Sequence, residues 1–264
     1  MLPAREVPRD AVQTMFIDLP GGRIEYSWSG EGPGAPVVML HEGLGSLAMW
    51  KDFPQRLSAV TGRRVLAYSR FGYGWSDPIR ERRRPDFMHR EALDVLPELF
   101  QRLGVIRPIL FGHSDGGSIA LIHAAAAPVA GVVAIAPHVF VEGFSLAEIR
   151  LARRSFEEGD LGARLARYHR DPAAAFLGWN DIWLDPVFEA WTIEDLLPRI
   201  GCPVLAVQGE DDEYGTMEQI ERIGRLCPGA SLLRLPACGH SPHRQQPEAL
   251  LEGGRAFVAG LGSS

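Results

Sequence analysis

Short apolar runs alternate with longer segments of helical spacing through the first half of the chain. Four runs are rich in β-branched residues and are not interrupted by charge. They lie at 37–40, 64–69, 108–112 and 132–136. The segments between them with apolar residues at helical spacing are 53–60, 88–102 and 115–127. Runs of the first kind are typical of strands buried on both faces, so the alternation predicts a parallel sheet covered by helices.

The same alternation resumes near the end of the chain. Residues 203–209 and 231–236 have the pattern of strands, and 217–226 and 247–260 that of helices. Residues 13–28 predict an antiparallel hairpin that starts the sheet and turns at Leu-Pro-Gly-Gly. The chain is therefore expected to form an α/β fold with a mostly parallel eight-stranded sheet and helices on both faces.

The stretch from 138 to 194 interrupts this alternation. It has helical patterns, lacks strand candidates and holds Trp179, Trp183 and Trp191, half of the six tryptophans. We expect a helical cap, inserted after the sixth strand, over the carboxyl ends of the strands, because ligands bind there in open α/β sheets. The predicted domains are a core of residues 1–137 and 195–264 and a cap of residues 138–194.

Composition narrows the classes of partner and of site. The chain has 264 residues, 46% of them hydrophobic, and a formal net charge of −6, which disfavours broad attraction to nucleic acid or to an anionic membrane. It has no 18-residue apolar span, and its first residues lack the apolar core of a signal peptide, so a cytoplasmic protein is expected. Its three cysteines, widely spaced, fit neither a disulfide framework nor a zinc site.

One local exception to the acidic balance is Arg-Glu-Arg-Arg-Arg-Pro at 80–85. A solvated loop is the preferred interpretation, because charge runs are usually exposed. The alternative is a patch that meets an anionic substrate.

The strongest chemical motif is Gly112-His113-Ser114-Asp115-Gly116, which reads G-x-S-x-G. It lies where the strand 108–112 must turn sharply into the helix 115–127, which is the context that this motif requires. Such a turn exposes the Ser114 hydroxyl above the sheet at the positive end of a helix. A glycine-rich turn with an incidental serine is the disfavoured alternative.

A serine hydroxyl needs a general base, and the base needs a partner that fixes its tautomer. Residues 209–215 (GEDDEYG) and 238–243 (CGHSPH) each follow a predicted strand, so both loops lie on the same edge of the sheet as Ser114. The first loop offers the carboxylates of Glu210, Asp211, Asp212 and Glu213. The second offers His240 and His243.

With these residues the chain resembles α/β-hydrolase-fold proteins of the capped serine-hydrolase type. The resemblance covers most of the chain, and the cap matches only in position. The stretches that carry it are HEGLGS (41–46), YSRFGYGWSDP (68–78), GHSDGG (112–117), VQGEDD (207–212) and the Gly-His pair at 239–240.

The resemblance implies a Ser114, His240 and Asp212 triad. The family's acid lies three residues after a glycine, as Asp212 does, and its histidine follows a glycine, as His240 does. It also implies an oxyanion hole formed by the backbone N–H groups of Asp115 and Gly43.

Two positions depart from the family pattern. Glu42 stands where the family usually has glycine, and Ser69 stands where it usually has aspartate. We expect the two changes to compensate, with Glu42 paired to Ser69, to Arg70 or to backbone N–H groups. The alternatives are that Glu42 faces the pocket and binds a cationic group, or that it repels anionic substrates.

The residues favour a serine hydrolase that cleaves a small carboxylic ester, lactone or related acyl compound. The alternatives are hydrolysis of a carbon–carbon bond in a ring-fission diketone, cofactor-free haloperoxidase-like activity, and a ligand receptor on a hydrolase scaffold. Neither a cofactor nor a metal is expected, because no ligand-spaced His/Cys cluster and no phosphate-binding G-x-x-x-x-G-K-[ST] motif occurs.

The expected partner is a small molecule with an apolar or aromatic acyl group. Trp179 and Trp183, four residues apart, can share a helix face that lines such a pocket, and Glu42 and His138 are further candidates for its lining. The alternative for the tryptophans and for His138 is a structural role. A monomer or a small homo-oligomer is expected.

Overall fold

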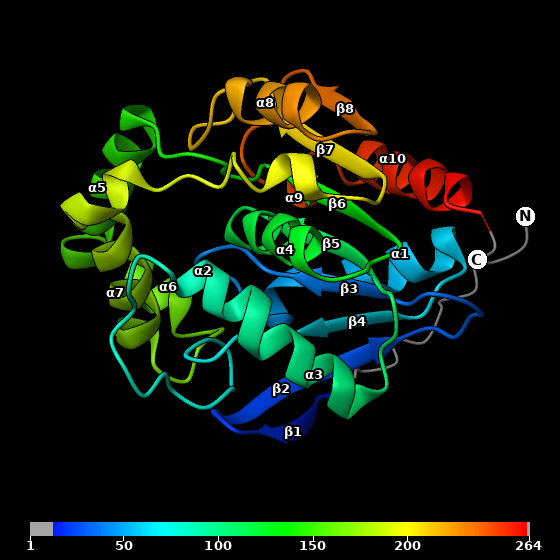
Figure 1. Cartoon of the computed structure of the whole chain (residues 1–264). Coiled ribbons are helices and arrows are strands. Elements are labelled where there is room, and N and C mark those ends of the chain that lie inside the picture. The colour runs from blue at the N-terminus through cyan, green and yellow to red at the C-terminus, as the bar shows by residue number, and fades with distance from the viewer. Residues whose placement is uncertain (1–12, 263–264) are drawn as a thin grey trace, which may run out of the picture.

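The computed structural model describes residues 13–262, which contain an eight-stranded sheet in the order β1-β2-β4-β3-β5-β6-β7-β8 (Figure 1). The strands are β1 (Met15–Leu19), β2 (Gly22–Ser29), β3 (Val37–Leu40), β4 (Val65–Tyr68), β5 (Ile109–His113), β6 (Gly131–Ile135), β7 (Val204–Gly209) and β8 (Ala230–Leu235). Strand β2 is antiparallel to β1 and β4, and all the other neighbouring pairs are parallel. The predicted hairpin and the mostly parallel sheet are both confirmed.

Each face of the sheet has its own hydrophobic core. Every residue of β3, β4, β5, β6 and β7 is buried, which explains why their sequences do not alternate between apolar and polar residues. Successive residues of a strand point to opposite faces, so Val38 and Leu110 belong to one core and Val37 and Ile109 to the other.

Helices cover both faces, as predicted. Helices α1 (Phe53–Thr61) and α10 (Pro247–Gly260) contact each other on one face. Helices α3 (Leu96–Leu103), α4 (Asp115–Ala126) and α8 (Glu218–Leu226) pack on the other (Figure 1). Short helices η1 (Leu47–Trp50), η4 (Leu197–Arg199) and α9 (Pro242–Gln245) lie in the connections.

The predicted helix at 88–102 consists of three consecutive pieces. Helix α2 (Phe87–Arg90) passes into a π-helical turn, η2 (Glu91–Val95), before α3 begins. Pro97 lies in the first turn of α3 and has no N–H to donate to the preceding turn. The wider π turn is a known way to absorb such a missing hydrogen bond.

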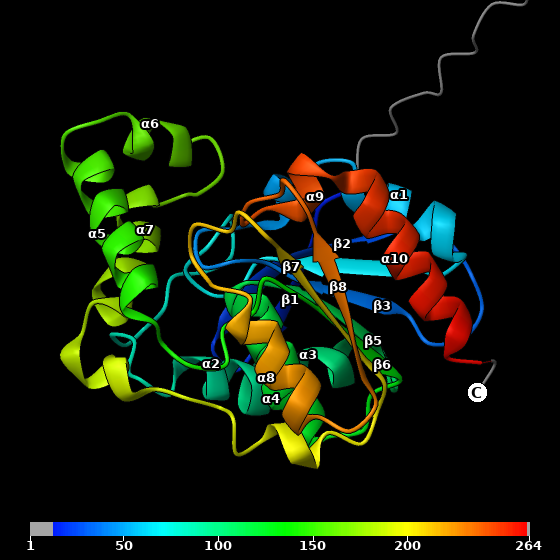
Figure 2. The same cartoon turned by 90° about the horizontal axis from the view of Figure 1, so that it is seen from above.

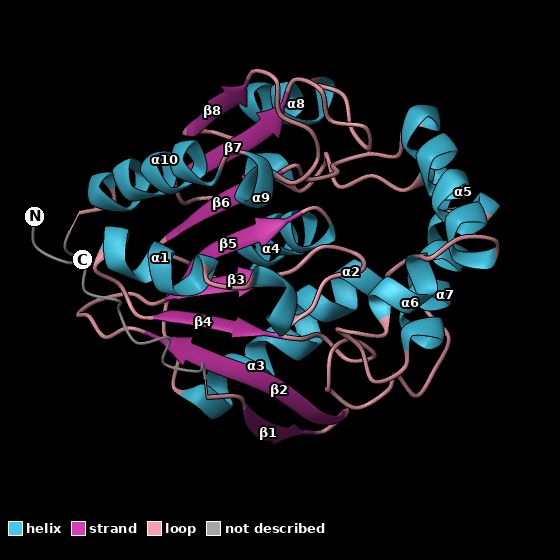
Figure 3. Cartoon of the chain, turned by 180° about the vertical axis from the view of Figure 1, so that it is seen from behind, coloured by secondary structure: helices cyan, strands magenta, loops and turns pink. Residues whose placement is uncertain are grey.

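Residues 138–194 contain the helices α5 (Gly143–Glu157), α6 (Leu161–Leu165), α7 (Pro172–Trp183) and η3 (Pro186–Ala190). Figure 2 shows α5, α6 and α7 grouped to one side of the sheet, and in Figure 3 they lie beyond the arrowheads of the parallel strands. One bridge, between Phe140 and Thr192, joins the two ends of this segment. The helices are consistent with a cap inserted after β6, and its boundaries at 138 and 194 stay a prediction.

None of the helices formed by residues 13–262 has the length and apolar character needed to cross a membrane.

Replacing Leu110 by Ala tests the importance of the core for stability. Leu110 is fully buried in β5, so the substitution should lower the free energy of unfolding in urea by about 2–5 kcal/mol. The matched control is Ile106→Ala, because Ile106 is 78% exposed and its loss should change stability by about 0.5 kcal/mol or less. Equal effects of the two substitutions would contradict this account of the core.

Candidate active site

The turn between β5 and α4 holds Ser114 in a backbone conformation that is rare for a side-chain-bearing residue. Its φ is 53° and its ψ is −121°. The flanking glycines make this turn possible. A Cβ at Gly112 would lie 2.2 Å from the Gly116 carbonyl oxygen, and one at Gly116 would lie 2.2 Å from the Leu40 carbonyl oxygen. The sequence motif therefore reflects backbone packing on both sides of the serine.

Ser114, His240 and Asp212 are joined by hydrogen bonds. The His240 Nε2 atom lies 3.0 Å from the Ser114 Oγ, and its Nδ1 lies 2.9 Å from the Asp212 Oδ1. Asp212 follows β7 and His240 follows β8, as the sequence order predicted. Two of the alternative candidates have other partners. Glu213 accepts the backbone N–H of His240, and the His243 ring packs against Trp50.

The surroundings of Asp212 favour its ionised form. The backbone N–H groups of Tyr214 and Gly215 donate to Oδ1, and the Gln208 side-chain amide donates to Oδ2. Burial raises the pKa of Asp212, but the His240 charge and hydrogen bonds outweigh it and hold this pKa below its usual value. Burial lowers the pKa of His240, and the Asp212 carboxylate more than reverses this, so the His240 pKa lies above its usual value.

A small cavity of about 120 Å³ adjoins Ser114 and His240. This reaction pocket is also lined by Glu42, Gly43, Leu44, Asp115, His138, Ile149, Trp179, Trp183 and Tyr214. It thus brings together every residue that the sequence suggested for the oxyanion hole and the pocket. The sequence pattern does not single out Leu44, Ile149 or Tyr214, although the position of Tyr214 two residues after Asp212 indicates that it lies near the site.

Trp183 and His138 pack against each other in the wall of the pocket. The Trp183 Nε1–H donates to the Asp115 Oδ1 at 3.2 Å, and the Trp183 ring lies 4.8 Å from that of His138. Burial lowers the pKa of His138 to about 3, so His138 is neutral near pH 7. Trp191, in contrast, is buried against Phe188 and does not line the pocket.

The predicted pairing of Glu42 with Ser69 or Arg70 is wrong. The Glu42 carboxylate lies 3.5 Å from the His113 Nδ1 and 3.6 Å from a guanidinium nitrogen of Arg244. Arg70 donates to the backbone carbonyl of Glu42, at 2.8 Å, and forms no ion pair with its carboxylate. Burial raises the pKa of Glu42, but its interactions with His113, His243 and Arg244 outweigh burial and hold the pKa well below its usual value.

Glu42 and His113 connect two loops of the pocket. The His113 Nε2 lies 2.7 Å from the His240 carbonyl oxygen, while its Nδ1 faces Glu42. The Glu42 carboxylate thus faces His113, which contacts the loop that carries His240, although Glu42 also lines the pocket. His113 of β5, distant in sequence, therefore holds the carboxylate that Glu42 adds to the loop 41–46.

Glu25 of β2, rather than Glu42, interacts with Ser69. The Ser69 hydroxyl donates to the Glu25 Oε1 at 2.5 Å, and the Trp75 N–H donates to the same oxygen at 2.9 Å. Ser69 in turn accepts the Leu47 N–H at 2.7 Å. Glu25 is 2% exposed, and burial raises its pKa even though the Ser69 and Trp75 hydrogen bonds act in the opposite direction. A carboxylate from another strand thus occupies the region where the family usually places an aspartate.

A sequence profile described as "Alpha/beta hydrolase family" matches residues 37–252. The chain belongs to the alpha/beta hydrolase family. It is 28% identical over 249 residues to serine hydrolase BPHL of Homo sapiens, covering 88% of this chain and 82% of that protein. It is 24% identical over 252 residues to the sn-1-specific diacylglycerol lipase ABHD11 of Mus musculus, covering 84% and 80% of the two chains.

Two solved structures share the fold of this chain. The structure of VinJ aligns with a TM-score of 0.75 at 23% identity, covering 95% of this chain and 99% of VinJ. A thermophilic esterase from Thermogutta terrifontis aligns with a TM-score of 0.72 at 24% identity, covering 94% and 99% of the two chains. The predicted fold and the hydrolase class are confirmed, whereas the roles of individual residues stay predictions.

A double-mutant cycle tests the pairing of Glu25 with Ser69. Ser69→Asp alone should place two buried carboxylates against each other and lower the free energy of unfolding by about 3 kcal/mol. Adding Glu25→Gln removes one of the charges and should recover at least half of that loss. Both values are read from urea denaturation at pH 7. Simple additivity of the two substitutions would show that the carboxylates do not interact.

Proposed function

We propose that the chain hydrolyses a small carboxylic ester through an acyl-enzyme on Ser114. The observation that carries this proposal is the hydrogen-bonded series from the Ser114 Oγ through His240 to Asp212. The names of the two curated relatives, a serine hydrolase and a diacylglycerol lipase, support the same reaction class.

In the first half of the proposed reaction, the Ser114 Oγ attacks the ester carbonyl carbon as His240 Nε2 takes its proton. Asp212 holds the imidazole ring and stabilises the imidazolium. The backbone N–H groups of Gly43 and Asp115 would stabilise the oxyanion, since both residues line the pocket beside Ser114. The tetrahedral adduct then loses the alcohol, which leaves with the proton from His240.

In the second half, His240 takes a proton from water as the water oxygen attacks the acyl carbon. The bond to the Ser114 Oγ then breaks, the serine regains its proton, and a carboxylic acid is released. The pocket of about 120 Å³ has apolar walls at Leu44, Ile149, Trp179 and Trp183, which favours a short apolar acyl group.

Covalent labelling and turnover together test this proposal. Ser114→Ala should lower kcat for p-nitrophenyl acetate by about 10⁴-fold or more and abolish labelling by a fluorophosphonate. The matched control is Ser155→Ala on α5, which should leave both unchanged. The panel should extend to longer p-nitrophenyl esters, lactones and a ring-fission diketone. Undiminished turnover by Ser114→Ala would refute the proposal, and turnover of the diketone alone would refute the ester assignment.

The pH dependence tests the role of Asp212. Only neutral His240 can act as the base, so kcat/KM should rise with pH through a pKa above 6.5. Asp212→Asn removes the charge that raises this pKa, so the inflection should move to lower pH while kcat falls by about 10⁴-fold. The exposed neighbour Asp211 provides the control Asp211→Asn, which should leave profile and rate nearly unchanged. Equal effects of the two substitutions would exclude a specific role for Asp212.

A further inference from the structure

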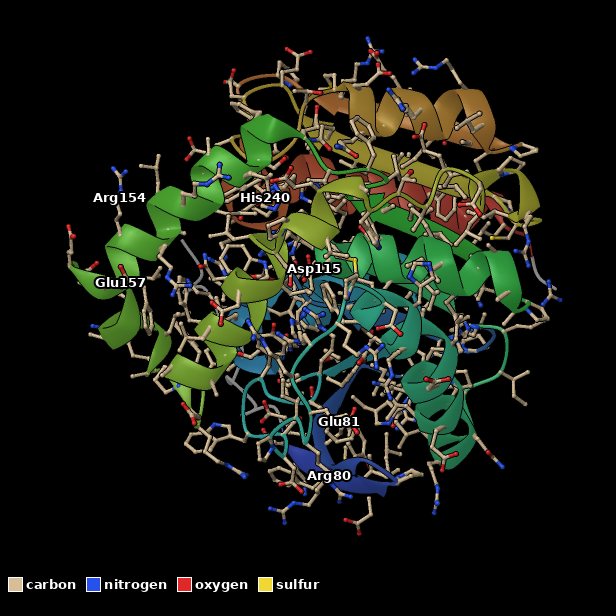
Figure 4. All side chains as sticks on the ribbon, turned by 60° about the vertical axis from the view of Figure 1, so that its left-hand side comes forward. Arg80, Glu81, Asp115, Arg154, Glu157 and His240 are labelled. Carbon is tan, nitrogen blue, oxygen red and sulfur yellow. The ribbon has the colours of Figure 1, made fainter. Side chains whose placement is uncertain are left out.

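A second cavity, of about 480 Å³, lies outside the reaction pocket. It is enclosed by the β1–β2 turn, the loop at 70–84 and the helices α2, η2 and α3, and it shares no lining residue with the reaction pocket. Figure 4 shows Arg80 and Glu81 beside the β1–β2 hairpin, away from Asp115 and His240. The arginine-rich run at 80–85 therefore borders a cavity of its own.

The walls of this cavity are mainly apolar. Phe71, Ile79, Phe87 and Val95 contribute side chains from the loop and from the helices above it. The volume falls within the range of about 300–1,000 Å³ that small-molecule sites occupy. An apolar ligand body could lie here without displacing any part of the core.

The exposed part of the cavity carries excess positive charge. The Arg82 guanidinium lies 3.9 Å from the Asp181 carboxylate. The Arg90 guanidinium lies 3.6 Å from the Glu81 carboxylate. Arg80 and Arg84 are exposed, and no acidic side chain within the described part of the chain forms an ion pair with either. Two unpaired guanidinium groups beside an apolar cavity are suited to an anionic head group.

Four acidic residues line the cavity, namely Glu81, Glu91, Asp94 and Glu98. Glu81 pairs with Arg90, and Asp94 is exposed with no ion pair to any described residue. Glu91 accepts the Tyr68 hydroxyl at 2.9 Å, and Glu98 is paired with Arg102 at 2.9 Å. The lining holds six arginines against these four acidic residues, so the cavity keeps a formal excess of two positive charges.

A buried donor also lines this cavity. Arg70 is 2% exposed, and its Nε–H has no hydrogen-bond partner in residues 13–262. An unpaired buried donor is costly, so Arg70 favours a bound acceptor, whether solvent or part of a ligand. The lining thus combines exposed guanidinium groups, apolar side chains and one buried, unpaired donor.

We propose that this cavity binds an apolar carboxylate, with its carboxylate between Arg80 and Arg84 and its apolar body against Phe71 and Phe87. Each guanidinium can donate two parallel N–H groups to a carboxylate, which neither a neutral alcohol nor a quaternary amine can accept in that way. The site is separate from the proposed reaction at Ser114.

Octanoate is a suitable probe, used below its micellar concentration and measured by calorimetry on the full chain. Octanoate should bind at least about tenfold more tightly than octanol or octyltrimethylammonium. The variant Arg80→Glu/Arg84→Glu should weaken octanoate binding by about tenfold or more, and Arg80→Lys/Arg84→Lys should retain part of it. Melting temperatures show whether each variant is folded.

Two controls separate this site from surface charge and from the reaction pocket. Arg150→Glu/Arg154→Glu makes the same change of charge at exposed positions on α5, where Figure 4 shows Arg154 far from Arg80, and should leave binding unchanged. Trp179→Ala alters the reaction pocket and should also leave it unchanged.

The proposal is overturned if octanoate does not bind, if the α5 variant weakens binding as much as the Arg80/Arg84 variant, or if binding depends on Trp179 alone. Ser114 labelling is read separately, so a failure of the proposed hydrolysis would leave this result standing.

Discussion

Burial of the central strands on both faces is the constraint on which the rest of the structure depends. Strands β3 to β7 have no exposed residue, so polar chemistry can be built only in the loops at their ends. Because β3, β5, β7 and β8 are parallel neighbours or near neighbours, their carboxyl ends open onto one edge. Gly43, Ser114, Asp212 and His240 come from those four loops and meet there.

The same edge collects several carboxylates, each with hydrogen-bond donors or a facing basic group of its own. Asp212 receives backbone and side-chain donors, Glu25 receives Ser69 and Trp75, and Glu42 faces His113. A buried carboxylate without such partners would be costly or would become protonated. The paired carboxylates therefore fix the loops relative to one another, and this keeps the positions around Ser114 defined.

The sheet, the hairpin, the covering helices and the site loops could be predicted because they depend on local patterns. Apolar runs specify buried strands, and Gly112 and Gly116 flag the tight turn at Ser114. The pairing of Glu25 with Ser69 could not be predicted, because the two residues are 44 positions apart and either could have satisfied its hydrogen bonds locally. The prediction for Glu42 failed for the same reason: its partners, His113 and Arg244, lie on elements whose side-chain directions depend on the finished fold.

The backbone conformation of Ser114 lowers the stability of the turn that presents the proposed nucleophile. At φ 53° and ψ −121° a glycine would be relaxed, whereas a serine stores strain that the β5–α4 packing must offset. Selection for a more stable protein alone would thus tend to erase the hydroxyl at this position. A protein that keeps serine here has a permanently less stable turn. It therefore tolerates a smaller further loss of folding free energy from mutations in the surrounding sheet.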